Sequence, residues 1–301
     1  MQLEDIFQEL LSSFIDADIH VSDYKEINYG IQFRAAGDEG QGVVRIYQNK
    51  KGETKYDYSQ LGGGQFAQKI ISLIEPQKQG AEAIEIGLPM IGADESGKGD
   101  FFGPLVCAAV YVDERTEMSL KAMNIRDSKN VSDNMILNLA QQIRTLCSEN
   151  IFVTALMPAE YNALYKEFTS RGEKLNALLA RAHAKTIREL AQKTNCRNIL
   201  LDQFGSEALI HQALGDEALS FHITQVHRAE RNTSVAAASI IARSVFLQSL
   251  KKIESRYGME FPKGASSQVI QSGKSFVKQF GKAELENVAK LHFKTAREII
   301  G

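Results

Sequence analysis

The stretch IGADESGKGDFFGPL, residues 91–105, decides how the rest of the sequence is interpreted. Residues 92–98 match G-x-x-x-x-G-K, the start of a P-loop that binds phosphates. The next position of a P-loop is Ser or Thr, but this chain has Gly99, and two adjacent acids, Asp94 and Glu95, lie inside the loop. The stretch therefore either holds the phosphates of a nucleotide or uses its acids for another purpose.

The sequence after Lys98 argues against a P-loop. A P-loop leads into a helix whose N-terminus faces the phosphates. Here Pro104 follows closely, and the next run, Leu105 to Val112, has the apolar, β-branched character of a strand. Gly99 offers no hydroxyl to Mg²⁺, and the two acids would repel a polyanion. A P-loop nucleoside triphosphatase stays open as an alternative enzyme class, for which ATP binding is the test.

Length, composition and cysteine content limit the class of protein. A chain of 301 residues with 44% hydrophobic residues suits one large domain or a core domain with a smaller one. Its three cysteines form no C-x-x-C pair, which argues against a zinc site or a disulfide framework and predicts a cytoplasmic protein. The acidic, amphipathic N-terminus does not resemble a signal peptide, and no apolar run approaches the ~18 residues of a membrane span. We therefore expect no membrane partner.

Charge is distributed unevenly along the chain. The net charge is −2, but residues 240–301 hold 11 Lys and Arg against 5 Asp and Glu, leaving 24 against 32 in the remainder. A basic C-terminal region on an acidic body is compatible with a polyanion-binding surface. On charge alone, a solvated helical face explains it better.

The N-terminal segment has the pattern of a small α/β unit. We predict helices over residues 3–14 and 65–74 and strands over residues 27–34, 43–47 and 55–58. Alternation places Tyr29 on the same face as Ile31 and Phe33, so it is expected in the core. Composition marks Pro76 to Pro89 as linker, which gives domains over residues 1–80 and 91–301 with a linker over residues 81–90.

The second segment alternates strands and helices. We predict strands over residues 91–94, 105–112, 151–157, 198–202 and 221–226, and helices over residues 136–146, 174–190 and 234–256. Asn232 and Thr233 are candidate caps of the last helix. Meander strands followed by strand–helix alternation predict an α/β fold with a mixed sheet flanked by helices.

Four acids follow predicted strands. Asp94 and Glu95 end one strand, Asp202 ends another, and Glu230 lies between a strand and the last long helix. Strand ends on one side of a sheet converge, and ligand sites favour such edges. Converging carboxylates repel one another unless hard divalent cations lie between them, and two such ions can clamp the attacking and leaving oxygens of a phosphodiester. Taken singly, Asp202 and Glu230 are better explained as an exposed strand end or a helix cap, whereas the adjacent pair Asp94 and Glu95 in a glycine-rich turn favours a functional role more strongly.

The motifs around these acids resemble the type 2 family of ribonucleases H. They are GADESGKGDFFGPLVCAAVYV (92–112), DSK (127–129), LLDQFG (200–205) and HRAERNTSVAAASIIAR (227–243). The G-K-G-D and F-G-P-L forms and the acid at Glu230 resemble the ribonuclease HIII branch of that family. With the small N-terminal unit, the resemblance covers nearly the whole chain.

The resemblance implies a fold, an activity and a metal requirement. The fold would be a ribonuclease H-like catalytic domain, residues 91–301, preceded by an α+β substrate-binding domain resembling the TATA-binding protein. The activity would be endonucleolytic hydrolysis of the RNA strand of RNA/DNA hybrids, leaving 5′-phosphate and 3′-hydroxyl ends. Two Mg²⁺ or Mn²⁺ ions would be held by the acids Asp94, Glu95, Asp202 and Glu230. Single ribonucleotides embedded in DNA would be poor substrates.

Recognition of RNA requires contact with the 2′-hydroxyl. The glycines of Gly97-Lys98-Gly99 let backbone groups approach a ribose, and Lys98 is suited to a phosphate. Without the family resemblance, the same residues are explained as a tight turn with an exposed lysine. Lys129 and Arg243 are further candidates for phosphate contacts.

Two other questions stay open at the level of sequence. None of the six histidines shows ligand-like spacing, so we expect ordinary core or surface residues; for His227, three residues from Glu230, a role in proton transfer is the alternative. A non-catalytic duplex-binding protein is the third functional class, although a pure binder has no need of four converging acids. We expect a monomer.

Overall fold

The computed structural model describes residues 3–17, 19–38, 40–49, 54–61, 64–74, 86–123, 125, 132–227 and 229–301. The chain divides into two compact units, Met1–Glu82 and Ala83–Gly301. The division falls inside the expected linker over residues 81–90, of which residues 81–85 lie outside the described residues. The two units are described separately below, and their functional roles stay predictions.

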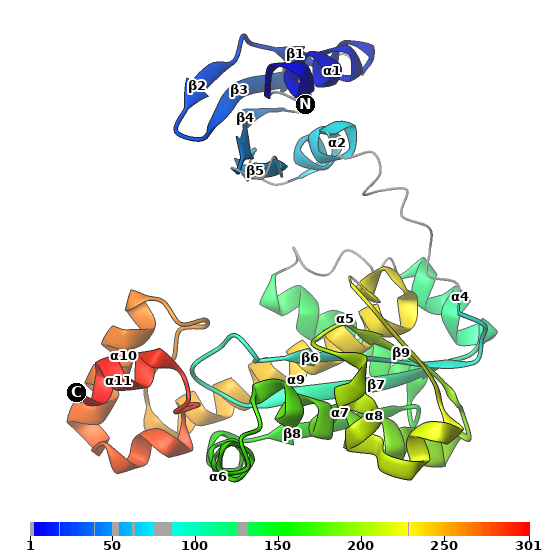
Figure 1. Ribbon diagram of the computed structural model, residues 1–301, viewed down its shortest axis with the longest axis vertical. Coiled ribbons are helices and arrows are strands. Elements are labelled where there is room, and N and C mark those ends of the chain that lie inside the picture. The colour runs from blue at the N-terminus through cyan, green and yellow to red at the C-terminus, as the bar shows by residue number, and fades with distance from the viewer. Residues whose placement is uncertain are drawn as a thin grey trace. The chain divides into compact units, whose positions relative to one another are not determined.

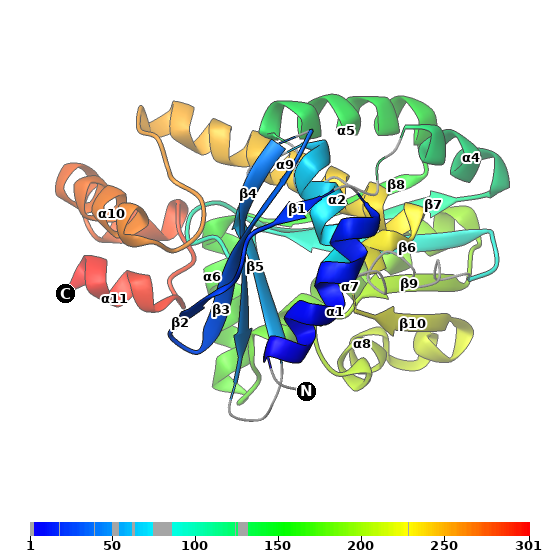
Figure 2. The same ribbon diagram turned by 90° about the horizontal axis from the view of Figure 1, so that it is seen from above.

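Within its described residues, the N-terminal unit is a five-stranded antiparallel sheet with two helices. Its strands are ordered β1-β3-β4-β5, with β2 paired to β3. The elements are α1 (Leu3–Asp16), β1 (His20–Val21), β2 (Lys25–Ile27), β3 (Gly30–Gly37), β4 (Gly40–Gln48), β5 (Thr54–Gln60) and α2 (Gln65–Ile74). Both helices pack on one face of the sheet (Figure 2), where Phe14, Phe33, Ile46 and Ile70 form the core. The opposite face carries Arg34 and Arg45.

The prediction that Tyr29 lies in the core is wrong. Its side chain is 81% exposed and its φ is 63°. The expected continuous strand is broken there, because β2 and β3 form a hairpin in which Ile27 pairs with Gly30. Two residues of turn interrupt the alternation on which the prediction rested, so Tyr29 points away from the face that buries Ile31 and Phe33.

The second unit is built on a mixed five-stranded sheet (Figure 1). Its strands are β6 (Met90–Ser96), β7 (Leu105–Val112), β8 (Ile151–Leu156), β9 (Asn198–Asp202) and β10 (His222–Val226). The spatial order is β10-β9-β6-β7-β8. The strands β6, β7 and β8 form an antiparallel meander, whereas β9 and β10 run parallel to β6. The predicted mixed sheet is thus confirmed.

Helices cover both faces of this sheet. Those of the unit are α4 (Glu114–Ala122), α5 (Asp133–Cys147), α6 (Pro158–Ser170), α7 (Leu175–Thr194), α8 (Glu207–Leu214), α9 (Thr233–Tyr257), α10 (Ser267–Phe280) and α11 (Lys294–Ile300). Alternate residues of β7 define the two cores: Val106 and Ala108 pack with α9, and Leu105 and Cys107 with α7. Figure 2 shows α5 and α9 on one side and α7 and α8 on the other.

The long helix α9 lies close against β6. A Cβ on Gly92 would lie 2.3 Å from the backbone carbon of Ser234, so only glycine fits there. Asn232, one of the two candidate caps, accepts a hydrogen bond from the Ser234 N–H at 2.9 Å. By length and by a mean hydropathy of 1.3, α9 could cross a membrane, contrary to the expectation from apolar runs, but 67% of that window is buried in this unit. Core helices of folded domains commonly meet the same criterion.

The C-terminal segment packs on residues 100–104. The Phe101 N–H donates to the Gly264 carbonyl at 2.9 Å, and the Gly103 N–H donates to the Val288 carbonyl at 2.9 Å. Lys290 is fully buried, and its Nζ donates to the Gly103 carbonyl at 2.6 Å. The end of the chain therefore fixes the loop that follows the glycine–lysine–glycine sequence.

The burial of Lys290 makes the stability of the fold dependent on pH. Burial lowers the pKa of Lys290 from 10.5 to about 7, and the negative charge of Asp100 opposes this shift. Between these values the unfolded chain binds more protons than the folded one, so the free energy of unfolding should rise with pH from 7 to 10.5, by at most about 1.4 kcal/mol per pH unit. Urea unfolding at pH 7, 8 and 9 measures this slope, which Lys290→Met should reduce. The exposed Lys274→Met serves as control, and equal slopes in all three proteins would contradict the assignment.

Candidate active site

Asp94 and Asp202 lie side by side at the ends of two parallel strands. In the β6–β9 register, Ala93 pairs with Leu201, so the next residue on each strand is an acid. On the other side of β9, Asp202 pairs with Val226, the last residue of β10. The carboxyl ends of β6, β9 and β10 therefore form one edge, the position where open α/β sheets bind ligands.

Glu230 reaches the same edge through a short helical turn. This turn, η3 (Ala229–Arg231), follows β10 and precedes α9. The Ala229 N–H donates to Asp202 Oδ1 at 2.9 Å. The hydrogen bond joins the segment that contains Glu230 to the acid at the end of β9, next to Asp94.

Asp94 and Glu95 project to opposite faces of the sheet although they are adjacent in sequence. Asp94 pairs with Ala108, on the α9 side, and Ser239 of α9 hydrogen-bonds to its carboxylate. Glu95 pairs with Cys107, on the α7 side. Alternation along a strand imposes this split. The two carboxylates thus leave β6 on opposite faces of the sheet.

The two adjacent acids have different pKa values for physical reasons. Burial, followed by the charge of Glu95, raises the pKa of Asp94 from 3.8 to about 7, and Asp202 adds to the rise. Burial also acts to raise the pKa of Glu95, but the hydrogen bond and charge of His183, with the charge of Lys98, outweigh it and lower the pKa. At pH 6 without metal, Asp94 is therefore protonated and Glu95 ionised.

The donor set suits a hard divalent cation. Carboxylate oxygens are the ligands that Mg²⁺ and Mn²⁺ prefer. The repulsion that raises the Asp94 pKa is the repulsion that a cation would remove. Within the described ranges, no three acid, histidine or cysteine side chains are yet close enough to form a finished metal site. The acids fit a cation in chemistry and location, with side chains that must draw together around it.

His183 is a residue of the site that the sequence did not indicate. It lies on α7, is 1% exposed, and its Nε2 is 3.1 Å from Glu95 Oε2. Its ring stacks on Phe204 at 5.0 Å between centroids. The residue occupies the apolar stripe of a long helix, where a histidine cannot be told from core by spacing alone. The expectation that it is an ordinary histidine is therefore incomplete.

The glycines of the glycine–lysine–glycine loop have different surroundings. Gly97 has a φ of 89°, and a Cβ there would lie 2.1 Å from the Pro104 carbonyl oxygen. Gly99 is exposed, and no atom of the described residues lies within 4 Å of the position that a Cβ would take. Between them, Lys98 Nζ lies 3.5 Å from Glu95 Oε1. Gly97 is thus required by the fold, whereas Gly99 leaves room for a ligand.

Arg243, Lys129 and His227 are the other residues for which the sequence suggested a role in the site. Arg243 on α9 pairs with Asp133 at 3.0 Å, and Lys263 pairs with the same carboxylate at 2.6 Å. Lys129 lies outside the described residues. His227 is exposed, and its suggested role in proton transfer stays a prediction. The structure therefore gives Arg243 an intramolecular partner and says nothing of Lys129.

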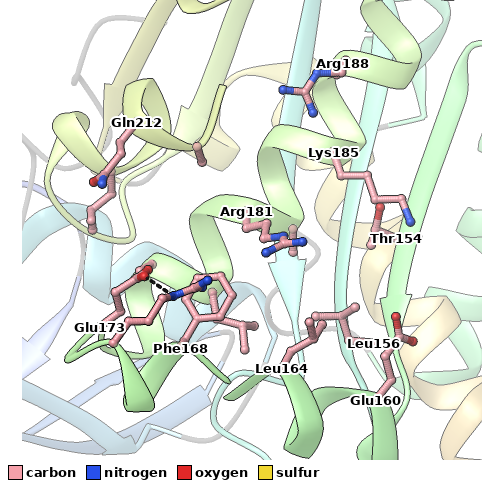
Figure 3. A pocket seen from close by; sticks show the side chains of 16 residues that line it. Thr154, Leu156, Glu160, Leu164, Phe168, Glu173, Arg181, Lys185, Arg188 and Gln212 are labelled. Atoms are coloured by element: carbon pink, nitrogen blue, oxygen red, sulfur yellow. Dashed lines mark hydrogen bonds and ion pairs between the residues drawn. The ribbon is translucent and has the colours of Figure 1, made fainter. Parts of the chain in front are cut away.

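A cavity of about 660 Å³ between β8, α6, α7 and α8 is separate from the acids (Figure 3). Four cations and two acids line it. Arg171 pairs with Glu173 at 2.9 Å, and Arg188 pairs with Glu217, which lies outside the lining, at 2.7 Å. None of Asp94, Glu95, Asp202 and Glu230 lines the cavity, so it is not part of the acid site.

Comparisons with known proteins show which family this chain resembles. A family model described as Ribonuclease HII matches residues 91–296. The chain is 42% identical over 213 residues to the ribonuclease HIII of Protochlamydia amoebophila, covering 71% of this chain and 69% of that protein. It is 45% identical over 216 residues to the ribonuclease HIII of Chlamydia muridarum, covering 71% and 70%.

Solved structures extend the likeness to both units. Bst-RNase HIII in complex with Mn²⁺ has a TM-score of 0.65 and 27% identity, covering 97% of this chain and 96% of that chain. Aquifex aeolicus RNase H3 has a TM-score of 0.57 and 26% identity, covering 96% and 97%. A resemblance of the N-terminal unit to the TATA-binding protein stays a prediction. The chain thus belongs to the ribonuclease HII family, is similar to its ribonuclease HIII members, and is a ribonuclease H endonuclease.

Proposed function

We propose that this endonuclease hydrolyses the RNA strand of RNA/DNA hybrids by two-metal-ion catalysis and leaves 5′-phosphate and 3′-hydroxyl ends. The observation that carries the proposal is the register of β6 and β9, which sets Asp94 beside Asp202, with Glu230 joined to the same edge. Bst-RNase HIII, similar over both units, is a complex with Mn²⁺. The acids Asp94, Glu95, Asp202 and Glu230 are the proposed ligands.

Divalent ions at these acids would supply a lowered water pKa and charge stabilisation of the leaving 3′-oxygen. The chain's own task is to keep the acids ionised and converging. Lys98 and His183 hold Glu95 as a carboxylate. Ser239 and the backbone N–H of Glu95 hydrogen-bond to Asp94 and favour its ionised form against burial. Mg²⁺ and Mn²⁺ both suit these oxygen donors.

Selection of RNA is assigned to the loop beside the acids. Gly99 is exposed and has open space around it, which supports a close approach of its backbone to a ribose 2′-hydroxyl. Lys98 is one-third exposed and adjacent to Glu95, which suits contact with the phosphate next to the cleaved bond. Arg243 and Lys129 are proposed to contact the backbone of the duplex farther away.

A pair of glycine substitutions separates the fold from substrate recognition. Gly99→Ala adds a methyl group to open space, so the melting temperature should stay unchanged while KM for the hybrid rises several-fold. Gly97→Ala should lower the melting temperature, because its φ of 89° and the Pro104 carbonyl exclude a Cβ. Thermal melting and hybrid cleavage kinetics measure both effects. An unchanged KM in Gly99→Ala would remove this loop from the recognition of the substrate.

The N-terminal unit is proposed to bind the duplex through the sheet face opposite its helices. On that face Arg34 and Lys55 are exposed, and Arg45 lies between Gln32 and Asp57. Cations on an open sheet suit the phosphate backbone, whose contribution to affinity depends on salt. The face lies in a unit that contains none of the four acids, so it is expected to affect binding and not the chemical step.

Substitution on this face gives a matching prediction. The double variant Arg34→Ala/Lys55→Ala should raise KM for the hybrid about 3–10-fold and reduce the salt dependence of binding, with kcat unchanged. Cleavage kinetics at two salt concentrations measure it, and Lys274→Ala on exposed α10 is the control. A fall in kcat with unchanged KM would be inconsistent with a binding role.

The activity itself is tested by incubating the protein with labelled RNA/DNA hybrid and Mg²⁺, with a DNA/DNA duplex and a chelator as controls. Cleavage of the RNA strand alone, with 5′-phosphate and 3′-hydroxyl products, supports the proposal. Binding of the hybrid without cleavage favours the duplex-binding class, and ATP binding favours the P-loop class. The strand β7 that follows the loop already speaks against the latter, because a P-loop requires a helix there.

The proposal also includes a location and an oligomeric state: the protein is cytoplasmic and monomeric and has no membrane partner. All three cysteines, Cys107, Cys147 and Cys196, are buried and free, as a reducing compartment allows. Size-exclusion chromatography with light scattering tests the monomer.

A further inference from the structure

Both oxygens of the Glu95 carboxylate are engaged by the protein. Oε2 accepts from His183 Nε2 at 3.1 Å, and Oε1 lies 3.5 Å from Lys98 Nζ. The Glu95 side chain is 14% exposed, and that of Lys98 is 34% exposed. The two partners therefore differ in kind, because Lys98 reaches Glu95 from the surface on a flexible chain, whereas His183 reaches it from the interior.

The position of His183 is fixed independently of Glu95. Its side chain is 1% exposed, and its ring stacks on Phe204 with an interplanar angle of 11°. Phe204 follows Asp202 by two residues. The imidazole thus touches an acid at the end of β6 and the segment that continues from the acid at the end of β9.

Among the described residues, the imidazole of His183 has one hydrogen-bond partner, Glu95. A carboxylate can only accept, so Nε2 carries the proton that is shared with Glu95. Nδ1 is buried and has no hydrogen-bond partner among the residues that the structure describes. A polar ring is costly to bury on an apolar helix face, so its one contact explains its presence there.

Strand alternation gives that contact its significance. Glu95 projects toward α7 while Asp94 projects toward α9, so Glu95 must curl around the strand end to share a cation with the other acids. A glutamate with three free torsions loses side-chain entropy when its carboxylate is fixed. A buried donor that pre-orders the carboxylate removes part of that cost before the ion arrives, as the outer partners of metal ligands generally do.

We propose that His183 is a positioning residue that orients the Glu95 carboxylate for binding of the divalent cation. The inference rests on the proposed function, in which Glu95 is a metal ligand. It adds a residue of α7 to a site otherwise built from strand ends and the turn before α9.

A matched pair of substitutions tests the reach of the donor. The amide nitrogen of Gln lies near the position of the ring Nε2, whereas that of Asn extends only as far as Nδ1. His183→Asn should therefore weaken Mn²⁺ binding about 10–100-fold, and His183→Gln should restore most of it. Titration of the metal-free protein with Mn²⁺, followed by electron paramagnetic resonance of the free ion, measures affinity without any substrate.

Kinetics and a control on the same helix complete the test. At limiting Mn²⁺, His183→Asn should lose kcat while KM for the hybrid stays unchanged, and saturating Mn²⁺ should recover much of the rate. Thr186→Val removes another buried polar contact of α7, the hydrogen bond to Thr154 at 2.8 Å. It should lower stability without changing Mn²⁺ affinity. If His183→Asn does not fold, His183→Leu replaces it as the variant without a donor.

The outcomes separate the inference from the function on which it rests. A wild-type protein that neither binds Mn²⁺ nor cleaves hybrid removes the proposed function. If the wild type does both, the inference is overturned when His183→Asn binds Mn²⁺ at least as tightly as the wild type. Equal losses in the Asn, Gln and Thr186→Val variants also overturn it, because the effect then reports on the packing of α7 and not on the donor.

Discussion

Asp94→Asn is expected to abolish cleavage of the RNA/DNA hybrid and, at the same time, to stabilise the metal-free protein at pH 8. Burial and the charge of Glu95 raise the pKa of Asp94 from 3.8 to about 7. The folded chain therefore holds a proton on Asp94 that the unfolded chain has lost, and its removal costs stability as pH rises from about 4 to 7. A neutral amide of the same shape escapes that cost, roughly 2–4 kcal/mol at pH 8.

Urea unfolding in the presence of a chelator, at pH 4.5, 6 and 8, measures the difference between the two proteins. The gain should be large at pH 8 and shrink toward pH 4.5, which lies close to the unfolded-state pKa of 3.8. Asp216→Asn, at an exposed position, is the control and should show no such pH-dependent gain. A variant less stable than the wild type at pH 8 would contradict the assignment of the raised pKa.

This combination of lost activity and gained stability distinguishes a site acid from a structural one. A carboxylate that stabilises the fold by a salt bridge has a lowered pKa, and the protein loses stability when that carboxylate is neutralised. Asp133, between Arg243 and Lys263, is such a group. Asp94 has the opposite shift, with Glu95 and Asp202 as like charges nearby. The fold tolerates that repulsion at the strand ends, where a cation is proposed to relieve it.

Much of the second unit was predictable because its strands are short apolar runs with clear ends. The expected strands over residues 105–112 and 198–202 match β7 and β9 residue for residue. Helix α10 was not predicted, although Val269, Phe276 and Phe280 recur at helical spacing and pack into one core.

The candidate site was predictable in its acids but not in their orientation. The motifs place Asp94, Asp202 and Glu230 at strand ends, and the sheet order then brings those ends together. Sheet order is a tertiary property, since β6 pairs with both β7 and the distant β9. His183 is 88 residues from Glu95 in sequence, so no local pattern could connect them.

The pH dependence of Mn²⁺ binding should report the proton on Asp94. A cation binds the carboxylate and not the carboxylic acid, so below the pKa of about 7 each bound ion at Asp94 must displace a proton. The apparent affinity should rise about tenfold per pH unit from pH 5 to 7 and level off above it. Titrations of the metal-free protein with Mn²⁺ at pH 5, 6, 7 and 8 give the slope. Asp216→Asn should reproduce it, whereas Asp94→Asn should bind weakly with a flatter dependence on pH.

The same proton links metal binding to stability. An ion that binds only the folded chain stabilises it by about 2.7 kcal/mol at one hundred times its dissociation constant. At pH 8 the wild type carries the ionised Asp94 beside Glu95 and Asp202, and the ion removes that repulsion. At pH 5 the proton has already removed it, so a fixed Mn²⁺ concentration should raise the melting temperature far more at pH 8 than at pH 5. An equal rise at both pH values would mean that Asp94 is not a ligand of the ion, because only a group that exchanges its proton for the metal couples the two equilibria.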